Sequence, residues 1–142
     1  MNELRQRAVR LLARREHTRA ELTRKLAPHG TPEEIDTVLN ELARTGLQSD
    51  ARFAESYVRS QSARLGAARL RQALRTKGVA TELIETGLVD LPDEMERARE
   101  VWTKKFAAPP SDAREWAKQA RFLQGRGFSS EVIRRLLKDI EE

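Results

Sequence analysis

The residues of this chain that could do acid–base or metal chemistry are few and scattered. His17 and His29 are its two histidines, and the sequence contains no cysteine. His17 stands beside an expected helix cap and His29 in an expected turn, and a protein zinc site needs three or four ligands. The adjacent carboxylates Glu33 and Glu34 fall in a first helical turn, where acids stabilise the helix. We therefore expect no catalytic residue, no enzymatic activity, no metal and no cofactor.

The glycines and the aromatic residues also give little indication of a catalytic or ligand-binding site. The segment 125–127, Gly-Arg-Gly, lacks the longer glycine pattern and the Lys-Ser/Thr pair of a phosphate-binding loop. Trp102 and Trp116 lie on apolar helical stripes, which favours core positions. Phe53 and Tyr57 could stack on nucleic-acid bases, but their spacing of four residues among other apolar residues favours packing.

The chemistry that remains is electrostatic. The 142 residues include 27 Lys and Arg and 22 Asp and Glu, giving a net charge of +5. Residues 5–25 hold eight basic and two acidic residues, and residues 52–77 hold seven basic residues and one acid. Residues 31–43 and 80–94 contain four and five acids and no base. A basic flank of this kind attracts a polyanion or an acidic protein, whereas the simpler alternative is that arginines only solvate exposed helix faces.

Every strong periodicity that could position these charges is helical. Leu4, Ala8, Leu11 and Leu12 follow the i, i+4, i+7, i+8 spacing of a one-sided helix, and no strand-like alternation occurs. Thr and Ser residues stand where helices should begin. The expected caps are Thr18 with Glu21, Thr31 with Glu34, Ser49, Ser111, and either Ser129 or Ser130.

A pattern of Leu, three residues, Gly, three residues, Glu and an apolar residue occurs three times. The three segments are LAPHGTPEEI, LRTKGVATEL and LQGRGFSSEV, and their leucines are 48 and 49 residues apart. The leucine fits the last core contact of a second helix, the glycine fits its left-handed end, and the glutamate fits the start of a third helix. The pattern predicts an all-α fold of three tandem three-helix repeats in an elongated, curved array, with boundaries at 1–47, 48–91 and 92–142.

The sequence lacks both a long apolar run and cysteine, and these two features bear on where the protein acts. No apolar run approaches the roughly 20 residues that cross a bilayer, and the lack of cysteine suits a reducing compartment. We expect a cytoplasmic monomer that does not bind membranes.

Several stretches resemble the RecX family of regulators of the RecA recombinase. GLQSDARFAESYV (46–58) is the most specific, LLARREHTRAELTRKL (11–26) resembles the family's first unit, and RFLQGRGFSSEVI (121–133) its third. Gln48 stands where the family commonly has an apolar residue. The resemblance implies three-helix repeats that bind the RecA–DNA filament and inhibit its ATPase, strand-exchange and coprotease activities. It thereby implies a part in DNA repair, recombination and the SOS response, with DNA contacted weakly or through the filament.

The second helix of the middle unit, 67–77, is the expected contact surface. Arg71 and Arg75 fall on one flank, away from the stripe of Leu70 and Leu74. Two other classes stay open, a direct nucleic-acid-binding protein acting through its basic helices, and a general helical scaffold. The residues that we predict to bind the filament or DNA are Arg52, Arg64, Arg69, Arg71, Arg75, Lys77, Arg121 and Arg126.

Overall fold

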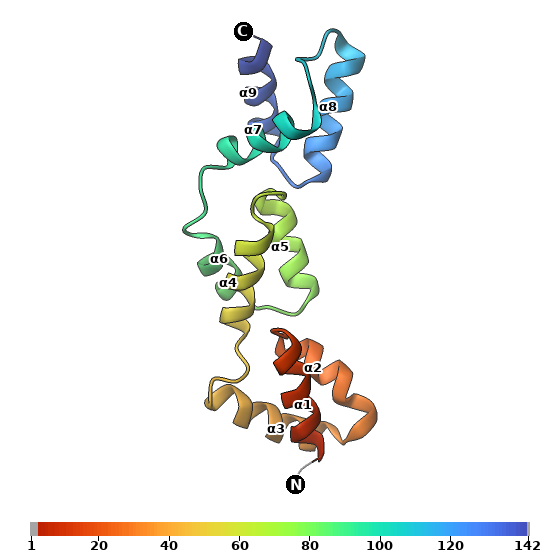
Figure 1. Cartoon of the computed structure of the whole chain (residues 1–142), viewed down its shortest axis with the longest axis vertical. Helices are drawn as coiled ribbons and strands as arrows, with labels where there is room; N and C mark the ends of the chain where they lie inside the picture. Colours follow the sequence, from red (N-terminus) through yellow and green to blue (C-terminus); the bar gives the residue numbers. More distant parts are fainter. Residues whose placement is uncertain (1–2, 142) are drawn as a thin grey trace. The chain divides into compact units, whose positions relative to one another are not determined.

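The computed structural model describes residues 3–141, and within that range it contains nine α-helices, one short 3-10 helix and no strand (Figure 1). This confirms the all-α prediction. The helices are α1 (Glu3–Arg14), α2 (Arg19–Leu26), η1 (Ala27–His29), α3 (Pro32–Arg44), α4 (Asp50–Gln61), α5 (Ala67–Thr76), α6 (Thr81–Leu88), α7 (Glu94–Lys105), α8 (Ala113–Gly125) and α9 (Ser130–Glu141).

Both predicted capping boxes are present. The Thr18 hydroxyl accepts a hydrogen bond from the Glu21 N–H at 3.0 Å, and the Glu21 carboxylate accepts one from the Thr18 N–H at 3.0 Å. Thr31 and Glu34 make the same pair of bonds at the start of α3, at 3.2 and 2.8 Å. Each box satisfies two backbone donors that the first helical turn leaves without a partner.

Two of the three predicted serine caps are confirmed and one is wrong. The Ser49 hydroxyl accepts from the Arg52 N–H at 3.1 Å, and the Ser129 hydroxyl accepts from the N–H three residues on at 3.2 Å. Ser111 does not cap α8, because the helix begins one residue later and Asp112 accepts from the Glu115 N–H at 2.8 Å. A carboxylate at this position also interacts favourably with the positive end of the helix dipole.

The folded chain divides into two compact units. One contains the chain up to Tyr57 together with Leu74–Gly87, and the other contains Val58–Ala73 together with the chain from Leu88 onward. Helices α4 and α5 therefore contribute residues to both units. The division falls inside the predicted middle repeat, so the predicted boundaries at residues 47 and 91 stay predictions.

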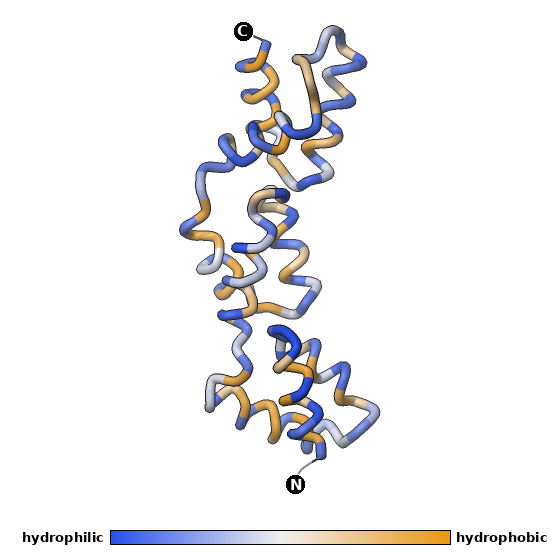
Figure 2. The backbone as a smooth tube through the Cα atoms, in the orientation of Figure 1, coloured by the Kyte–Doolittle hydropathy of each residue, from blue (hydrophilic) through white to orange (hydrophobic). Residues whose placement is uncertain are grey.

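Each unit has a core built from helical stripes, seen in Figure 2 as hydrophobic positions recurring along each helix. In the first unit the core joins α1, α2 and α3, and in the second it joins α7, α8 and α9. The first consists of Leu4, Ala8, Leu22, Leu26, Ile35, Val38, Leu39 and Leu42. The second consists of Ala98, Val101, Leu123, Phe128, Ile133, Leu136 and Leu137, with Trp102 and Trp116 packed against it.

Further apolar side chains are packed outside these two clusters. Phe53 and Tyr57 are stacked with ring centroids 6.3 Å apart, as expected of core residues. Leu74 and Ile84 are fully buried in the first unit, and Leu70 is fully buried in the second. Among the described residues, no helix combines the length and the apolar character needed to cross a membrane.

Candidate partner-binding surface

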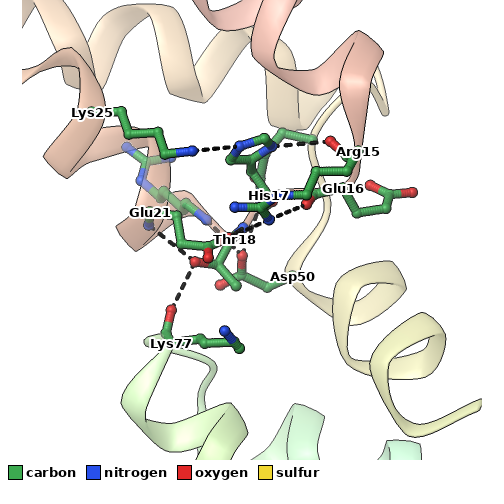
Figure 3. Close-up of polar contacts among 10 residues, drawn as sticks. Arg15, Glu16, His17, Thr18, Glu21, Lys25, Asp50 and Lys77 are labelled. Carbon is green, nitrogen blue, oxygen red and sulfur yellow. Dashed lines mark hydrogen bonds and ion pairs between the residues drawn. The ribbon is translucent and has the colours of Figure 1, made fainter. Parts of the chain in front are cut away.

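The start of α2 is held by two residues of the middle repeat, and we call these contacts the first joint (Figure 3). The Arg19 N–H donates to the carboxylate of Asp50, the first residue of α4, at 2.8 Å. The Thr18 hydroxyl donates to the Lys77 carbonyl, which follows the end of α5, at 2.7 Å. The first joint therefore satisfies the helix start of one repeat with acceptors from the next.

The second unit contains the same arrangement one repeat further on, the second joint. The Ala67 N–H, at the start of α5, donates to the carboxylate of Glu94, the first residue of α7, at 3.0 Å. The preceding Gly66 N–H donates to the Arg126 carbonyl at 2.7 Å. Glu94 also accepts from the Ser129 N–H at 3.2 Å. Asp50 and Glu94 thus have equivalent roles, which the charge pattern alone did not indicate.

A left-handed glycine belongs to each joint. Gly78 has φ 89° and Gly127 has φ 93°, a conformation that residues with a Cβ rarely adopt. A Cβ on Gly78 would overlap the Cβ of Ala20, and one on Gly127 would overlap the Cβ and backbone of Arg69. At Gly78 and Gly127 the recurrent glycine therefore both ends a helix and allows close contact with the preceding repeat. At Gly30, in the first of the three segments, the predicted left-handed conformation is wrong, because its φ of −171° is extended.

Buried polar side chains surround the first joint. His17 and Gln48 are both buried, and the Gln48 amide donates to the His17 carbonyl at 3.3 Å and to Asp50 at 2.9 Å. Gln48 therefore holds the carboxylate that accepts from the first N–H of α2. This network assigns His17 to a structural role.

His17 fits its surroundings as a neutral ring. Nδ1 lies 3.0 Å from the Arg15 carbonyl oxygen and Nε2 lies 3.1 Å from the Lys25 ammonium nitrogen. These partners require a donor at Nδ1 and an acceptor at Nε2, which is one neutral tautomer. Burial lowers the pKa of His17, against a hydrogen bond to Arg15 that raises it.

A buried arginine supports the second joint. The Arg97 guanidinium donates to the carbonyls of Ser62 at 3.1 Å and Leu65 at 2.7 Å. Burial lowers the pKa of Arg97, while the charges of Glu94 and Asp93 raise it. The burial of Arg97 was not predicted from the sequence, because a charged residue in α7 gives no hydrophobic signal that it lies inside the protein.

Four of the eight predicted contact residues make hydrogen bonds within their own unit. Arg52 pairs with the Glu16 carboxylate and donates to the carbonyls of Gly46 and Leu47. The other three are in the second unit. Arg64 donates to Gln61 at 3.1 Å, Arg69 donates to the Gly125 carbonyl at 2.6 Å, and Arg126 donates to the Arg64 carbonyl at 3.4 Å.

The other four lie on or beside exposed helix surface. Arg75 and Arg121 are exposed, and Arg71 is half-buried on the same helix as Arg75. The Lys77 ammonium lies 5.9 Å from the centroid of the Tyr57 ring. Arg71 and Arg75 both lie on α5, four residues apart.

From residue 3 to residue 141, no group of three His, Asp or Glu side chains is placed to hold a metal ion. The arrangement can instead supply a positively charged helical surface.

The helical units and the two equivalent joints define this chain as a tandem array of three-helix domains. Models of three such domains match it in order. The first RecX three-helix domain matches residues 5–42, the second matches residues 49–88 and the third matches residues 92–137. The chain belongs to the RecX family.

Curated relatives support this assignment. The regulatory protein RecX of Leptothrix cholodnii is 50% identical over 137 residues, covering 95% of this chain and 87% of the relative. The regulatory protein RecX of Chromobacterium violaceum is 46% identical over 135 residues, covering 94% and 88%. The relatives' shared name places the chain among regulatory proteins.

Solved structures agree in fold. A crystal structure of regulatory protein RecX matches with a TM-score of 0.84 and 26% identity, covering 96% of this chain and 72% of that chain. The crystal structure of RecX from Lactobacillus salivarius matches with a TM-score of 0.83 and 23% identity, covering 98% and 95%. This second likeness concerns the fold alone.

Proposed function

We propose that this protein is a non-enzymatic regulator of the RecA recombinase, which binds the RecA–DNA filament and inhibits it. The observation that carries the proposal is the match of all three RecX three-helix domains, in order, over most of the chain. By inhibiting the filament, the protein would lower its ATPase, strand-exchange and coprotease activities. It would thereby limit recombination, repair and the SOS response in the cytoplasm.

The contact proposed for the filament is the flank of α5 that carries Arg71 and Arg75. Arg75 is exposed, and the two residues are four apart, so their side chains point in similar directions. Arg52, Arg64, Arg69 and Arg126 are weaker candidates than exposed Arg75, because binding would compete with the hydrogen bonds that they already make. Exposed Arg121 is a secondary candidate.

Direct binding of nucleic acid is the second candidate function, favoured by the basic residues of 5–25 and 52–77. Two features argue against it as the main activity. Phe53 is buried and stacked on Tyr57, which removes a surface for base stacking. In addition, α3 and α6, the third helices of the first two repeats, are the acidic ones, whereas a recognition helix lies beside phosphates.

Co-sedimentation separates the two functions. The protein is spun with RecA assembled on single-stranded DNA in the presence of a non-hydrolysed ATP analogue, and in parallel with an equal amount of bare DNA. Regulation of the filament predicts pelleting with the filament at salt concentrations that release the protein from bare DNA. Equal, steeply salt-dependent recovery with bare DNA would instead identify a nucleic-acid-binding protein.

A matched pair of variants tests the contact. Reversing Arg71 and Arg75 to Glu should reduce recovery with the filament at least tenfold, a loss of about 1.4 kcal/mol. The control reverses Arg44 and Arg114, two exposed arginines outside α5, and has the same change in net charge. If the control variant loses as much as the α5 variant, the contact is not on α5.

A further inference from the structure

A pocket with a volume of about 410 Å³ lies in the first unit, between α1 and the segment formed by α2 and η1. Its apolar lining comes from Leu11, Ala13 and Leu26. Three arginines of α1 stand at positions i, i+3 and i+7 and also line it, together with Lys25. The complete lining is Arg7, Arg10, Leu11, Ala13, Arg14, Lys25, Leu26 and His29.

The cations of this pocket exceed the acids that neutralise them. Arg7 has one carboxylate nearby, that of Glu3, at 4.0 Å. The Arg7 Nε is buried and makes no hydrogen bond within the described chain. Arg10 and Arg14 are exposed.

The guanidinium groups select for carboxylate or phosphate, which they bind through two parallel hydrogen bonds. The apolar lining distinguishes between a peptide and a nucleic acid. Residues 1–47 contain no Phe, Tyr or Trp, and the one ring in the pocket lining, the imidazole of His29, is a smaller stacking surface than the large aromatic rings that bind bases. An aliphatic side chain flanked by carboxylates fits both the apolar lining and the arginines.

We propose that this pocket binds an acidic peptide segment of a partner protein, with one aliphatic side chain seated on Leu11 and Ala13. Carboxylates on either side of that residue pair with Arg7, Arg10, Arg14 and Lys25. The site lies in the first repeat and shares no residue with the α5 surface proposed to bind the filament. The pocket is therefore a second interaction surface of this protein, and the proposal for the pocket does not depend on the proposed binding of the filament by α5.

Fluorescence anisotropy with a fluorescein-labelled synthetic peptide of repeating Glu-Glu-Leu units tests the site. Ala13→Glu places a carboxylate at an exposed position in the pocket, and Ala43→Glu makes the same change at an exposed position of α3 outside it. Arg10→Glu removes a pocket cation, and Arg24→Glu is its exposed control on α2. Circular dichroism establishes that each variant folds.

The proposal expects Ala13→Glu and Arg10→Glu each to weaken binding at least tenfold, and the two controls to weaken it less than threefold. A Glu-Glu-Ser peptide should bind at least tenfold more weakly than the Glu-Glu-Leu peptide, because it lacks the aliphatic anchor. Equal loss in pocket and control variants would overturn the proposal, since attraction would then be unspecific. Equal binding of the two peptides would also overturn it.

Two other occupants have distinct outcomes. If labelled oligothymidylate binds as tightly as the Glu-Glu-Leu peptide and Ala13→Glu weakens it tenfold, the pocket is a nucleic-acid site and the peptide proposal fails. If analytical ultracentrifugation shows a dimer that Ala13→Glu disperses, the occupant is a second copy of the chain and the proposal also fails. A monomer that binds the peptide but not the oligonucleotide is the expected result.

Discussion

Gly78 offers the sharpest test of the joints between repeats, because three glycines of this chain form a graded series. Gly78 has a left-handed backbone and a Cβ there would overlap the Cβ of Ala20. Gly46 has a similar φ of 83° but has open space where a Cβ would lie. Gly125 is helical and also has open space. Substituting each by Ala therefore separates backbone strain from the closeness of the joint.

The expected free energies of unfolding follow from these surroundings. Gly125→Ala should be neutral or stabilising by up to about 1 kcal/mol, because alanine favours the helix. Gly46→Ala should cost about 1–2 kcal/mol for the left-handed backbone alone. Gly78→Ala carries the same cost plus about 1–3 kcal/mol for overpacking, because Ala20 is short and cannot rotate away. The total for Gly78→Ala is about 2–5 kcal/mol.

Urea denaturation followed by circular dichroism measures the series. A double-mutant cycle with Ala20→Gly isolates the contact, because this change removes the Cβ that Gly78→Ala would strike. The cycle should give a favourable coupling of at least about 1 kcal/mol. If Gly78→Ala and Gly46→Ala cost the same within about 0.5 kcal/mol, and the coupling is zero, the close contact at the first joint is wrong.

Three further predictions follow from the packing and the charges. Leu74→Ala should lower the free energy of unfolding by about 2–5 kcal/mol in urea denaturation, because Leu74 is fully buried. Its control is Leu47→Ala at a half-exposed position, which should cost less than about 1 kcal/mol. Equal costs for the two variants would contradict the repeat alignment. Because burial lowers the pKa of His17, the folded state binds fewer protons than the unfolded state, so the free energy of unfolding should fall as the pH drops below about 6.5. His17→Gln should flatten that fall, and an unchanged slope between pH 7 and pH 5 would show that His17 does not cause it. Glu94→Ala removes the acceptor of two N–H groups, those of Ala67 and Ser129, and should cost about 1–3 kcal/mol, whereas exposed Glu100→Ala should change the free energy by less than about 0.5 kcal/mol.

Local signals in the sequence predicted the helices and most of their ends. Thr18 and Thr31 cap helices as expected, because a hydroxyl three residues before a glutamate acts within one turn. The prediction that Ser111 caps α8 was wrong, because the adjacent Asp112 can also cap and the sequence does not indicate where the backbone first turns.

Contacts between residues distant in the chain were much harder to predict. Arg52, one of the predicted contact residues, pairs with Glu16, and its place on a partner surface stays a prediction. The pairing of Arg52 does not follow from helical spacing, since Glu16 is 36 residues away in the chain. The recurrence of the Gly pattern did predict the repeats, but the function of that glycine in the joints required the structure.

The ATPase activity of RecA on single-stranded DNA tests the central claim most directly. ATP hydrolysis is followed while this protein is added at substoichiometric amounts relative to RecA, and the variant with Arg71 and Arg75 both changed to Glu is added in parallel. Regulation through α5 predicts that the wild-type protein suppresses hydrolysis and that the folded variant needs at least tenfold more protein for the same effect. Hydrolysis that stays unchanged with saturating wild-type protein would contradict the account.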